Sequence, residues 1–283
     1  MILLLLFITV MMGHSILSVS GQTDSNCPAA TIDISPCVCS SYTTFLGSSV
    51  QIDCSRQELS DTGLGDILNQ IPATTKVSFF QLSWNSLTKT PDLTKFTAKA
   101  TISNSYNWLL KVDISSNPIE TLDLTWFSKN LKTPITLLAS NFSITSVDLT
   151  RVSSSDSSSL SLCQIDLSGN KQLKSVSNIG YGSTACSIVN GFAPFLFLNN
   201  SAITQISSGL YNPTVATVQG VSDVTIDLSN NALTNIDNFF TPLSTNFGTA
   251  TLNLGFNQIT SISNNVILKF SGKKKASICQ TTI

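Results

Sequence analysis

Histidine is almost absent from this 283-residue chain, since only His14 is present, near the N-terminus. A Ser-His or Cys-His nucleophile needs this residue, and histidine is also the commonest zinc ligand. His14 falls within a segment that we predict to be removed. Most hydrolase and metal-enzyme classes are therefore excluded, and we expect a protein that is not an enzyme, with no cofactor and no metal site.

Charge is also scarce, because only 11% of the residues are Asp, Glu, Lys or Arg and the formal net charge is −1. This balance indicates no nucleic-acid partner. Hydrophobic residues make up 42% of the chain, which is enough for a sizeable core. The composition thus predicts a globular protein with an unusually neutral surface.

Long hydrophobic runs are missing apart from residues 2–12, "ILLLLFITVMM", which are too few to cross a bilayer comfortably. Small residues, Ser18 and Ser20, follow this run just before a plausible cleavage point at Gly21. We therefore predict a signal peptide over residues 1–20 and a secreted, extracellular protein. We expect no membrane anchor, because no later run reaches membrane length.

The seven cysteines fit secretion, because disulfides persist in oxidising compartments. Four of them cluster early, at Cys27, Cys37, Cys39 and Cys54. Disulfides are favoured over a metal knuckle here, and three pairings of the four are open from the sequence alone. Cys163 and Cys186 lie in neighbouring repeats and are expected to form another bridge, which leaves Cys279 as the odd thiol.

A repeated pattern, L-x-x-L-x-L-x-x-N-x-L, organises the rest of the chain. Seven copies place an asparagine at the same position, at residues 85, 117, 141, 170, 200, 231 and 257. In each copy the two aliphatic residues of L-x-L share one face of a short strand and point inward. The asparagine amide can satisfy backbone groups that stacking would bury. Neighbouring copies then stack into a parallel sheet with a continuous core.

With these motifs, residues 27–270 resemble the extracellular leucine-rich-repeat family. The resemblance implies an α/β solenoid, a horseshoe with a parallel concave sheet and an irregular convex side. It divides the chain into a cysteine-rich N-terminal cap over 21–60 and about seven repeats over 61–283, with an atypical C-terminal end. It also implies that the cap pairs Cys27 with Cys39 and Cys37 with Cys54. More loosely, the cap and the irregular repeats resemble the non-catalytic leucine-rich-repeat subunits of secreted shrimp luciferases and their arthropod relatives.

Strand alternation then predicts which residues line the concave face. The central column comprises Gln81, Asp113, Leu137, Asp166, Leu196, Asp227 and Asn253, and Leu198 lies in the next column. The aspartates stand two strands apart, roughly 10 Å, just beyond the separation of about 6.5–9.5 Å used by inverting glycosidases. We therefore interpret them as solvated or partner-binding carboxylates. The aliphatic residues between them are either a partner-binding strip or the product of an error in register.

Two N-glycosylation sequons begin at Asn141 and Asn199. Asn199 is the better candidate, because Asn141 occupies a position of the repeat that should be buried.

The sequence predicts a secreted protein that binds another protein through its solenoid surface, as a scaffold or accessory subunit. One alternative is an innate-immune module that binds a microbial glycan or lipid, but aromatic platforms would favour it and the expected concave face has almost none. The other alternative, a stand-alone enzyme, is disfavoured by the missing histidine.

Overall fold

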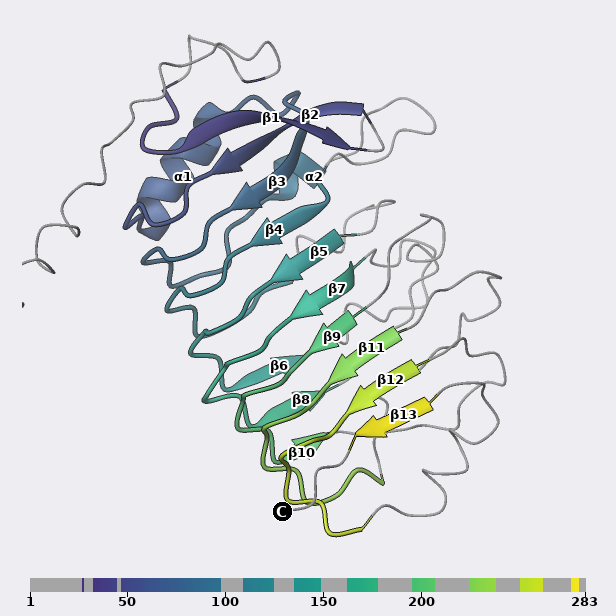
Figure 1. Ribbon diagram of the computed structural model, residues 1–283. Helices are drawn as coiled ribbons and strands as arrows, with labels where there is room; N and C mark the ends of the chain where they lie inside the picture. Colours follow the sequence, from purple (N-terminus) through teal and green to yellow (C-terminus); the bar gives the residue numbers. More distant parts are fainter. Residues whose placement is uncertain are drawn as a thin grey trace, which may run out of the picture.

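A computed structural model gives the fold of the chain (Figure 1). It describes residue 27 and residues 33–44, 47–97, 109–124, 135–148, 162–177, 195–206, 224–237, 250–261 and 276–279. The signal peptide predicted over residues 1–20 lies outside these ranges. Cys186 does too, so the predicted bridge to Cys163 falls outside the described part of the chain.

One ten-stranded sheet runs the length of the molecule (Figure 1). Its strands, in spatial order, are β1 (Val38–Thr44), β2 (Gly47–Asp53), β3 (Val77–Gln81), β4 (Lys111–Asp113), β5 (Ile135–Leu138), β7 (Leu162–Asp166), β9 (Phe195–Phe197), β11 (Val224–Asp227), β12 (Ala250–Asn253) and β13 (Ala276–Cys279). The β1–β2 pair is antiparallel, and every later pairing is parallel. This is the predicted solenoid.

A second, three-stranded parallel sheet stacks behind the middle of the first (Figure 1). It consists of β6 (Ser146–Asp148), β8 (Ser175–Ser177) and β10 (Gln205–Ile206). Val147 and Val176 pair directly across it, and both are buried in the core. The side of the solenoid that was expected to be irregular is therefore regular in its central turns.

The core is a ladder of side chains from successive strands. Its central rung positions are Phe80, Val112, Leu137, Ile165, Leu196, Ile226 and Leu252, each paired with the next across the sheet. All of them are buried. Because each strand buries alternate side chains, no turn forms a core alone, and stacking supplies the apolar contact.

Helices are few in the described residues: only α1 (Asp61–Gln70) and α2 (Thr94–Thr97), both near the N-terminal end. The hydroxyl of Ser60 caps α1 by accepting a hydrogen bond from the N–H of Gly63 at 3.2 Å. α1 then buries Leu64, Ile67 and Leu68 against the first turns. The described architecture is accordingly a β-solenoid with a helical element at one end. Neither described helix has the length and apolar character needed to cross a bilayer.

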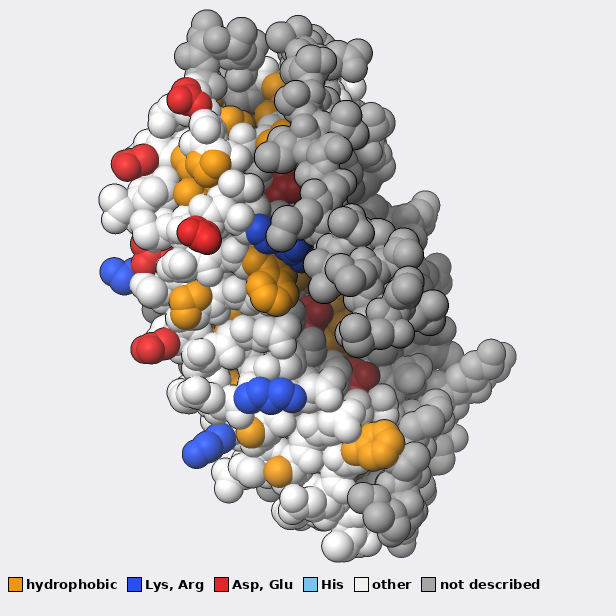
Figure 2. Space-filling model, turned by 60° about the vertical axis from the view of Figure 1, so that its left-hand side comes forward, with side chains coloured by type: hydrophobic (Ala, Val, Ile, Leu, Met, Phe, Trp, Pro, Cys, Tyr) orange, Lys and Arg blue, Asp and Glu red, His pale blue; other side chains and the backbone are white. Residues whose placement is uncertain are grey.

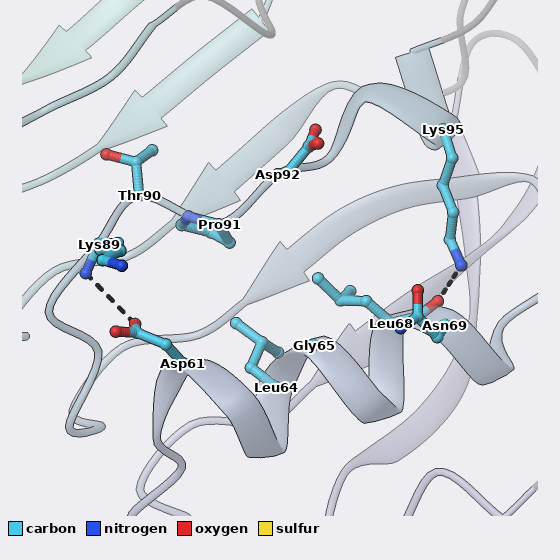
Figure 3. Close-up of a pocket in the computed structure, with 10 residues that line it drawn as sticks. All are labelled: Asp61, Leu64, Gly65, Leu68, Asn69, Lys89, Thr90, Pro91, Asp92 and Lys95. Atoms are coloured by element: carbon cyan, nitrogen blue, oxygen red, sulfur yellow. Dashed lines mark hydrogen bonds between the residues drawn. The ribbon is translucent and has the colours of Figure 1, made fainter.

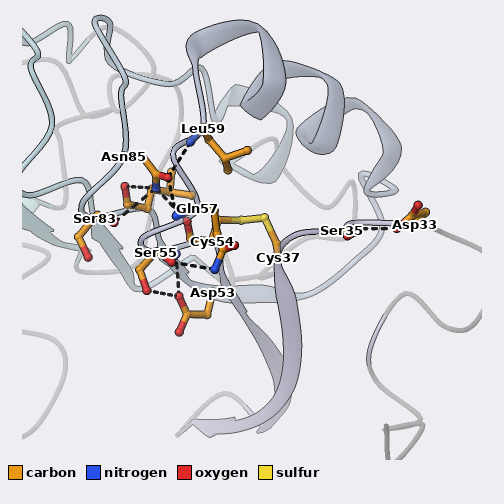
Figure 4. The surroundings of a disulfide bond; sticks show 11 residues. Asp33, Ser35, Cys37, Asp53, Cys54, Ser55, Gln57, Leu59, Ser83 and Asn85 are labelled. Carbon is orange, nitrogen blue, oxygen red and sulfur yellow. Dashed lines mark hydrogen bonds between the residues drawn. A yellow bond between two sulfur atoms is a disulfide. The ribbon is translucent and has the colours of Figure 1, made fainter. Parts of the chain in front are cut away.

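Two disulfides hold the N-terminal hairpin. Cys37 bonds Cys54 with Cα atoms 4.3 Å apart (Figure 4), and Cys27 bonds Cys39 with Cα atoms 5.9 Å apart. This is the pairing that the family resemblance implied. The carbonyl of Cys54 accepts a hydrogen bond from the Nδ2 of Asn85 at 2.8 Å, so the capping hairpin is joined directly to the first repeat.

Five buried or half-buried asparagines bridge successive turns: Asn85, Asn117, Asn170, Asn231 and Asn257. In each, Nδ2 donates to a carbonyl three residues earlier and to a carbonyl of the preceding turn. Each Oδ1 accepts a backbone N–H from that preceding turn. The amide thus satisfies backbone groups that stacking has removed from water.

The predicted ladder positions of Asn141 and Asn200 are wrong by one residue. Phe142 and Ser201 follow them at the ladder position, while Asn141 and Asn200 adopt φ values of 57° and 54°. Asparagine tolerates this left-handed conformation better than most residues do. The same turn position has positive φ in every described repeat, including Trp84 at 58°.

Candidate functional site on the open face of the long sheet

The open face is the side of the long sheet opposite the core, and its central column crosses eight strands. The column comprises Asp53, Gln81, Asp113, Leu138, Asp166, Phe197, Asp227 and Asn253, each paired directly with the next. All eight side chains are half-buried. Between β4 and β11, acidic and apolar residues alternate from strand to strand.

Three residues predicted to lie on this face are instead in the core. Leu137, Leu196 and Leu198 are each 0% exposed. The error follows from placing asparagine on the ladder at residues 141 and 200, because a shift of one residue turns every side chain of a strand to the other face. The predictions for Gln81, Asp113, Asp166, Asp227 and Asn253 place these residues on the face where they are found.

Each aspartate of the column closes the turn at the end of its strand. The Oδ1 atoms of Asp113, Asp166 and Asp227 accept hydrogen bonds from the N–H of the serine two residues later at 2.9–3.0 Å. Asn253 makes the equivalent bond with the N–H of Gly255 at 3.1 Å. This Asx turn is a local backbone function, which explains why the repeat favours Asp or Asn at this position.

Where the column carries leucine, a neighbouring turn supplies the missing acceptor. Leu138 cannot cap its turn, and the N–H of Ser140 donates to Oγ of Ser115 at 3.2 Å. The apolar residue is therefore accommodated without an isolated backbone donor.

The aspartates of the column stand apart from one another. Asp166 and Asp227 are separated by one intervening strand, β9, so their backbones lie roughly 10 Å apart. Oδ2 of Asp227 accepts a hydrogen bond from Nδ2 of Asn253 at 3.2 Å. Asp227 thus uses both carboxylate oxygens within the fold, one for its own turn and one for the neighbouring strand.

An aromatic pair on β9 was not predicted for this face. Phe195 and Phe197 point to the same side of the strand, and their rings stack with centroids 4.4 Å apart and planes 13° from parallel. The alternation in "FLFL" was visible in the sequence, but it fits either register. Only the direct pairing of Phe197 with Asp166 and Asp227 places the rings on the open face.

The column before the central one is mainly polar. It contains Gln51, Phe79, Lys111, Thr136, Gln164, Phe195, Thr225 and Thr251. The ammonium of Lys111 lies 4.6 Å from the ring centroid of Phe79. Among the described residues of these two columns, Lys111 is the one cation against four aspartates.

The side where the strands end exposes two large aromatic residues. Trp84 and Phe256 are 59% and 57% exposed, and the guanidinium of Arg56 lies 5.7 Å from the Trp84 ring centroid. Figure 2 shows this side as mostly uncharged, with separate acidic and basic side chains and isolated hydrophobic patches. No continuous charged or apolar surface is seen on the described part of this view.

A pocket of about 370 Å³ lies between α1 and the segment before α2 (Figure 3). Its polar groups hold the two elements together. Asp61 accepts hydrogen bonds from Thr88 Oγ1 at 2.5 Å and from the N–H groups of Thr88 and Lys89 at 3.0 and 3.2 Å. The ammonium of Lys95 donates to the carbonyl of Leu68 near the end of α1.

The ionisation of these groups fits a structural role. Burial by itself raises the pKa of Asp61, but the hydrogen bonds from Thr88 and Lys89 and the charge of Lys89 offset it, so the pKa is lowered. Burial lowers the pKa of Lys95. Both groups are engaged by backbone, and the described residues contain no cluster of three or more metal-ligating side chains.

The two sequons differ from expectation in their exposure. Asn141 is exposed and its Oδ1 lies close to Gly169, whereas Asn199 is half-buried beside Phe197 on the open face. The objection to Asn141 as an acceptor therefore no longer holds, because that residue is outside the buried ladder.

Comparison with models of known protein families finds no match, and a search of curated proteins finds no relative either.

Proposed function

We propose that this chain is a secreted leucine-rich-repeat protein that binds another protein through the open face of its long sheet, as a non-catalytic scaffold or accessory subunit. The disulfide-bonded cap, the parallel strands and the asparagine bridges between turns support the family assignment. Secretion is supported by the two disulfides, which persist in an oxidising compartment.

The observation that carries the binding role is the alternation of acidic and apolar residues across five neighbouring strands. Asp113, Leu138, Asp166, Phe197 and Asp227 form one row of directly paired, half-buried side chains. The turns use only one oxygen of Asp113 and Asp166. A row of this kind offers apolar contact and charge together on a rigid support, as recognition surfaces do.

The aromatic pair on the open face, which was not predicted there, would favour glycan recognition. Its arrangement nevertheless suits a protein partner better. Sugar rings pack against the flat face of an aromatic ring, and Phe195 and Phe197 direct one flat face of each ring at the other. The aspartates would also repel anionic microbial polymers. The open face therefore favours a protein partner.

Cross-linking mass spectrometry with an amine-reactive reagent tests this role in the native secretion, with the tagged full-length chain as bait. We expect links from one co-secreted protein to Lys111, the open-face lysine of the described columns. The Lys111→Arg variant is the control, because it removes the reactive amine and keeps the cation beside Phe79.

The proposal is contradicted if partner links concentrate on Lys174, which precedes β8 on the opposite side of the solenoid, and Lys111 gives none. Turnover of any substrate by the purified chain would contradict the non-catalytic part of the proposal. Links that disappear in the Lys111→Arg variant would support it.

A further inference from the structure

We propose that the open face recognises a basic amphipathic α-helix of its protein partner, with cations seven residues apart and apolar residues between them. This inference rests on the proposed function and specifies the chemistry of the partner. It is carried by the row Asp113, Leu138, Asp166, Phe197 and Asp227.

The pitch of the row sets the spacing of the partner's residues. Neighbouring strands lie about 4.8 Å apart, so successive aspartates of the row recur at roughly 10 Å. On an α-helix, residues seven apart are separated by about 10.5 Å and lie on nearly the same side. The mismatch over three aspartates is only about 2 Å, which flexible Arg or Lys side chains can absorb.

The apolar positions fall where such a helix needs them. Residues three and four positions after a cation lie on the same helical face, about halfway to the next cation. Leu138 stands between Asp113 and Asp166, and Phe197 stands between Asp166 and Asp227. An extended strand fits less well, because its same-face residues recur at about 6.8 Å or 13.6 Å.

Charge complementarity selects a basic partner. The two described columns carry four aspartates and one lysine, and Lys111 is already placed over Phe79. An acidic helix would meet like charge at every second strand, whereas a basic one would find a carboxylate there. Phe195 enlarges the apolar contact beside Phe197, because the stacked rings stand together above β9.

A designed peptide tests this recognition directly. The probe is a 20-residue alanine-rich helix with Arg at positions 3, 10 and 17 and Leu at 6, 7, 13 and 14, and its partner probe carries Glu in place of Arg. Binding to the full-length secreted chain is measured by fluorescence anisotropy at low and high ionic strength. We expect the Arg helix to bind, the Glu helix not to bind, and salt to weaken binding.

The decisive variant is the double substitution Asp166→Asn and Asp227→Asn. Asn253 caps the same turn with its side-chain oxygen, so asparagine keeps the turn at both positions and removes the charge. At residue 227 it also gives up the Oδ2 that accepts from Asn253, so the single Asp166→Asn variant, which leaves that bond intact, is measured beside the double one. Two lost ion pairs predict an affinity about five- to thirtyfold lower, with a weaker dependence on salt.

Phe197→Ser is expected to lower the affinity for the Arg helix about tenfold or more. Asp53→Asn is the matched control, because Asp53 makes the same turn outside the alternating row, and it should change affinity less than twofold.

Equal binding of the Arg and Glu helices, no binding of either, or an unchanged affinity in the Asp166 and Asp227 variant would overturn the inference. The cross-linking experiment reports separately on the open face. Partner links to Lys111 together with failure of the helix probes would leave the proposed function standing and remove only the basic-helix partner.

Discussion

The backbone N–H of Phe142 donates a hydrogen bond to Oδ1 of Asn170, at 2.8 Å, from one turn of the solenoid to the next. Nδ2 of the same amide donates to the carbonyls of Leu167 and Ala139 at 2.6 and 3.2 Å. Asn170 is fully buried, so water cannot replace these partners. One side chain therefore satisfies three backbone groups in two turns.

Asn170→Ala should be strongly destabilising, because it leaves these three buried groups without partners. Each costs about 1–3 kcal/mol and the costs are not additive, so we expect a loss of about 2–4 kcal/mol in the free energy of unfolding. Urea titration followed by circular dichroism measures the change in midpoint. Asn257→Ala is the control, because Asn257 is half-buried and water can take over part of its role. Equal losses of stability in the Asn170 and Asn257 variants would show that the loss does not depend on how deeply the asparagine is buried.

Gly169→Ala should also destabilise the solenoid, for two separable reasons. Gly169 has φ of +71°, where a Cβ costs about 1–2 kcal/mol, and that Cβ would lie 2.2 Å from Oδ1 of Asn141. The second variant, Gly169→Ala with Asn141→Gly, removes the collision and keeps the strain at residue 169. We expect it to recover part of the lost stability in the same titration. No recovery would show that the contact with Asn141 contributes nothing.

The repeat made most of the fold predictable, and its failures have a definite cause. Around Asn117, Asn231 and Asn257, aliphatic spacing and asparagine agree, and the expected inward residues are inward. In "LLASNF" and "FLFLNNS", two registers place apolar residues at the required spacing. The asparagine favoured one register, while burial of Leu137 and Leu196 favoured the other.

The register that buries Leu137 and Leu196 is the one observed, because the two registers differ in energy. It buries Leu196 and Leu198 and leaves Phe195 and Phe197 stacked on each other at the surface, where part of their area is still covered. It also gives the left-handed turn position to Asn141 and Asn200, which tolerate it. Matching the repeat pattern alone weighs neither the burial of the leucines nor the tolerance of asparagine for the left-handed turn position. The apolar members of the candidate site were therefore misassigned, while its aspartates, flanked by unambiguous repeats, were placed correctly.

The role of the aspartates in closing turns predicts a clear order among variants of Asp227. Its Oδ1 accepts hydrogen bonds from both the N–H and the Oγ of Ser229, at 2.9 and 2.7 Å. Asp227→Ala removes both and should cost about 1 kcal/mol, whereas Asp227→Asn should cost much less because its oxygen can accept the N–H. Thermal unfolding of the two variants distinguishes them. If Asn is as harmful as Ala, the main contribution of Asp227 is its charge or the bond of its Oδ2 with Asn253, and not turn closure.

Stability in acid should depend on Asp61. Burial by itself raises its pKa in the folded chain, but the hydrogen bonds from Thr88 and Lys89 and the charge of Lys89 together outweigh burial, so the pKa is lowered. Its ionised form therefore stabilises the fold above the unfolded-state pKa of about 3.9, and this contribution is lost as the pH falls through the folded-state value. Asp61→Asn should lower stability at pH 7 and flatten its decline below about pH 4. Thr88→Val removes only the side-chain donor and should give an intermediate result. A wild-type acid profile in Asp61→Asn would contradict this linkage.

The two disulfides of the cap should differ in what their removal costs. Cys37–Cys54 spans 17 residues and joins two cysteines that are 8% and 1% exposed, whereas Cys27 and Cys39 are only partly buried. Replacing Cys37 and Cys54 by alanine should lower the free energy of unfolding by about 3 kcal/mol from the lost cross-link, with a further loss from the cavity left in the core.

Cys54 also precedes the turn held by Asn85, so its loss should loosen the cap and the first repeat together. Replacing Cys27 and Cys39 is the matched control and should cost less. Amide hydrogen exchange in β2 and β3 should be faster in the variant that lacks Cys37 and Cys54. If exchange in these strands stays at the wild-type rate, the repeats stabilise the cap without this disulfide.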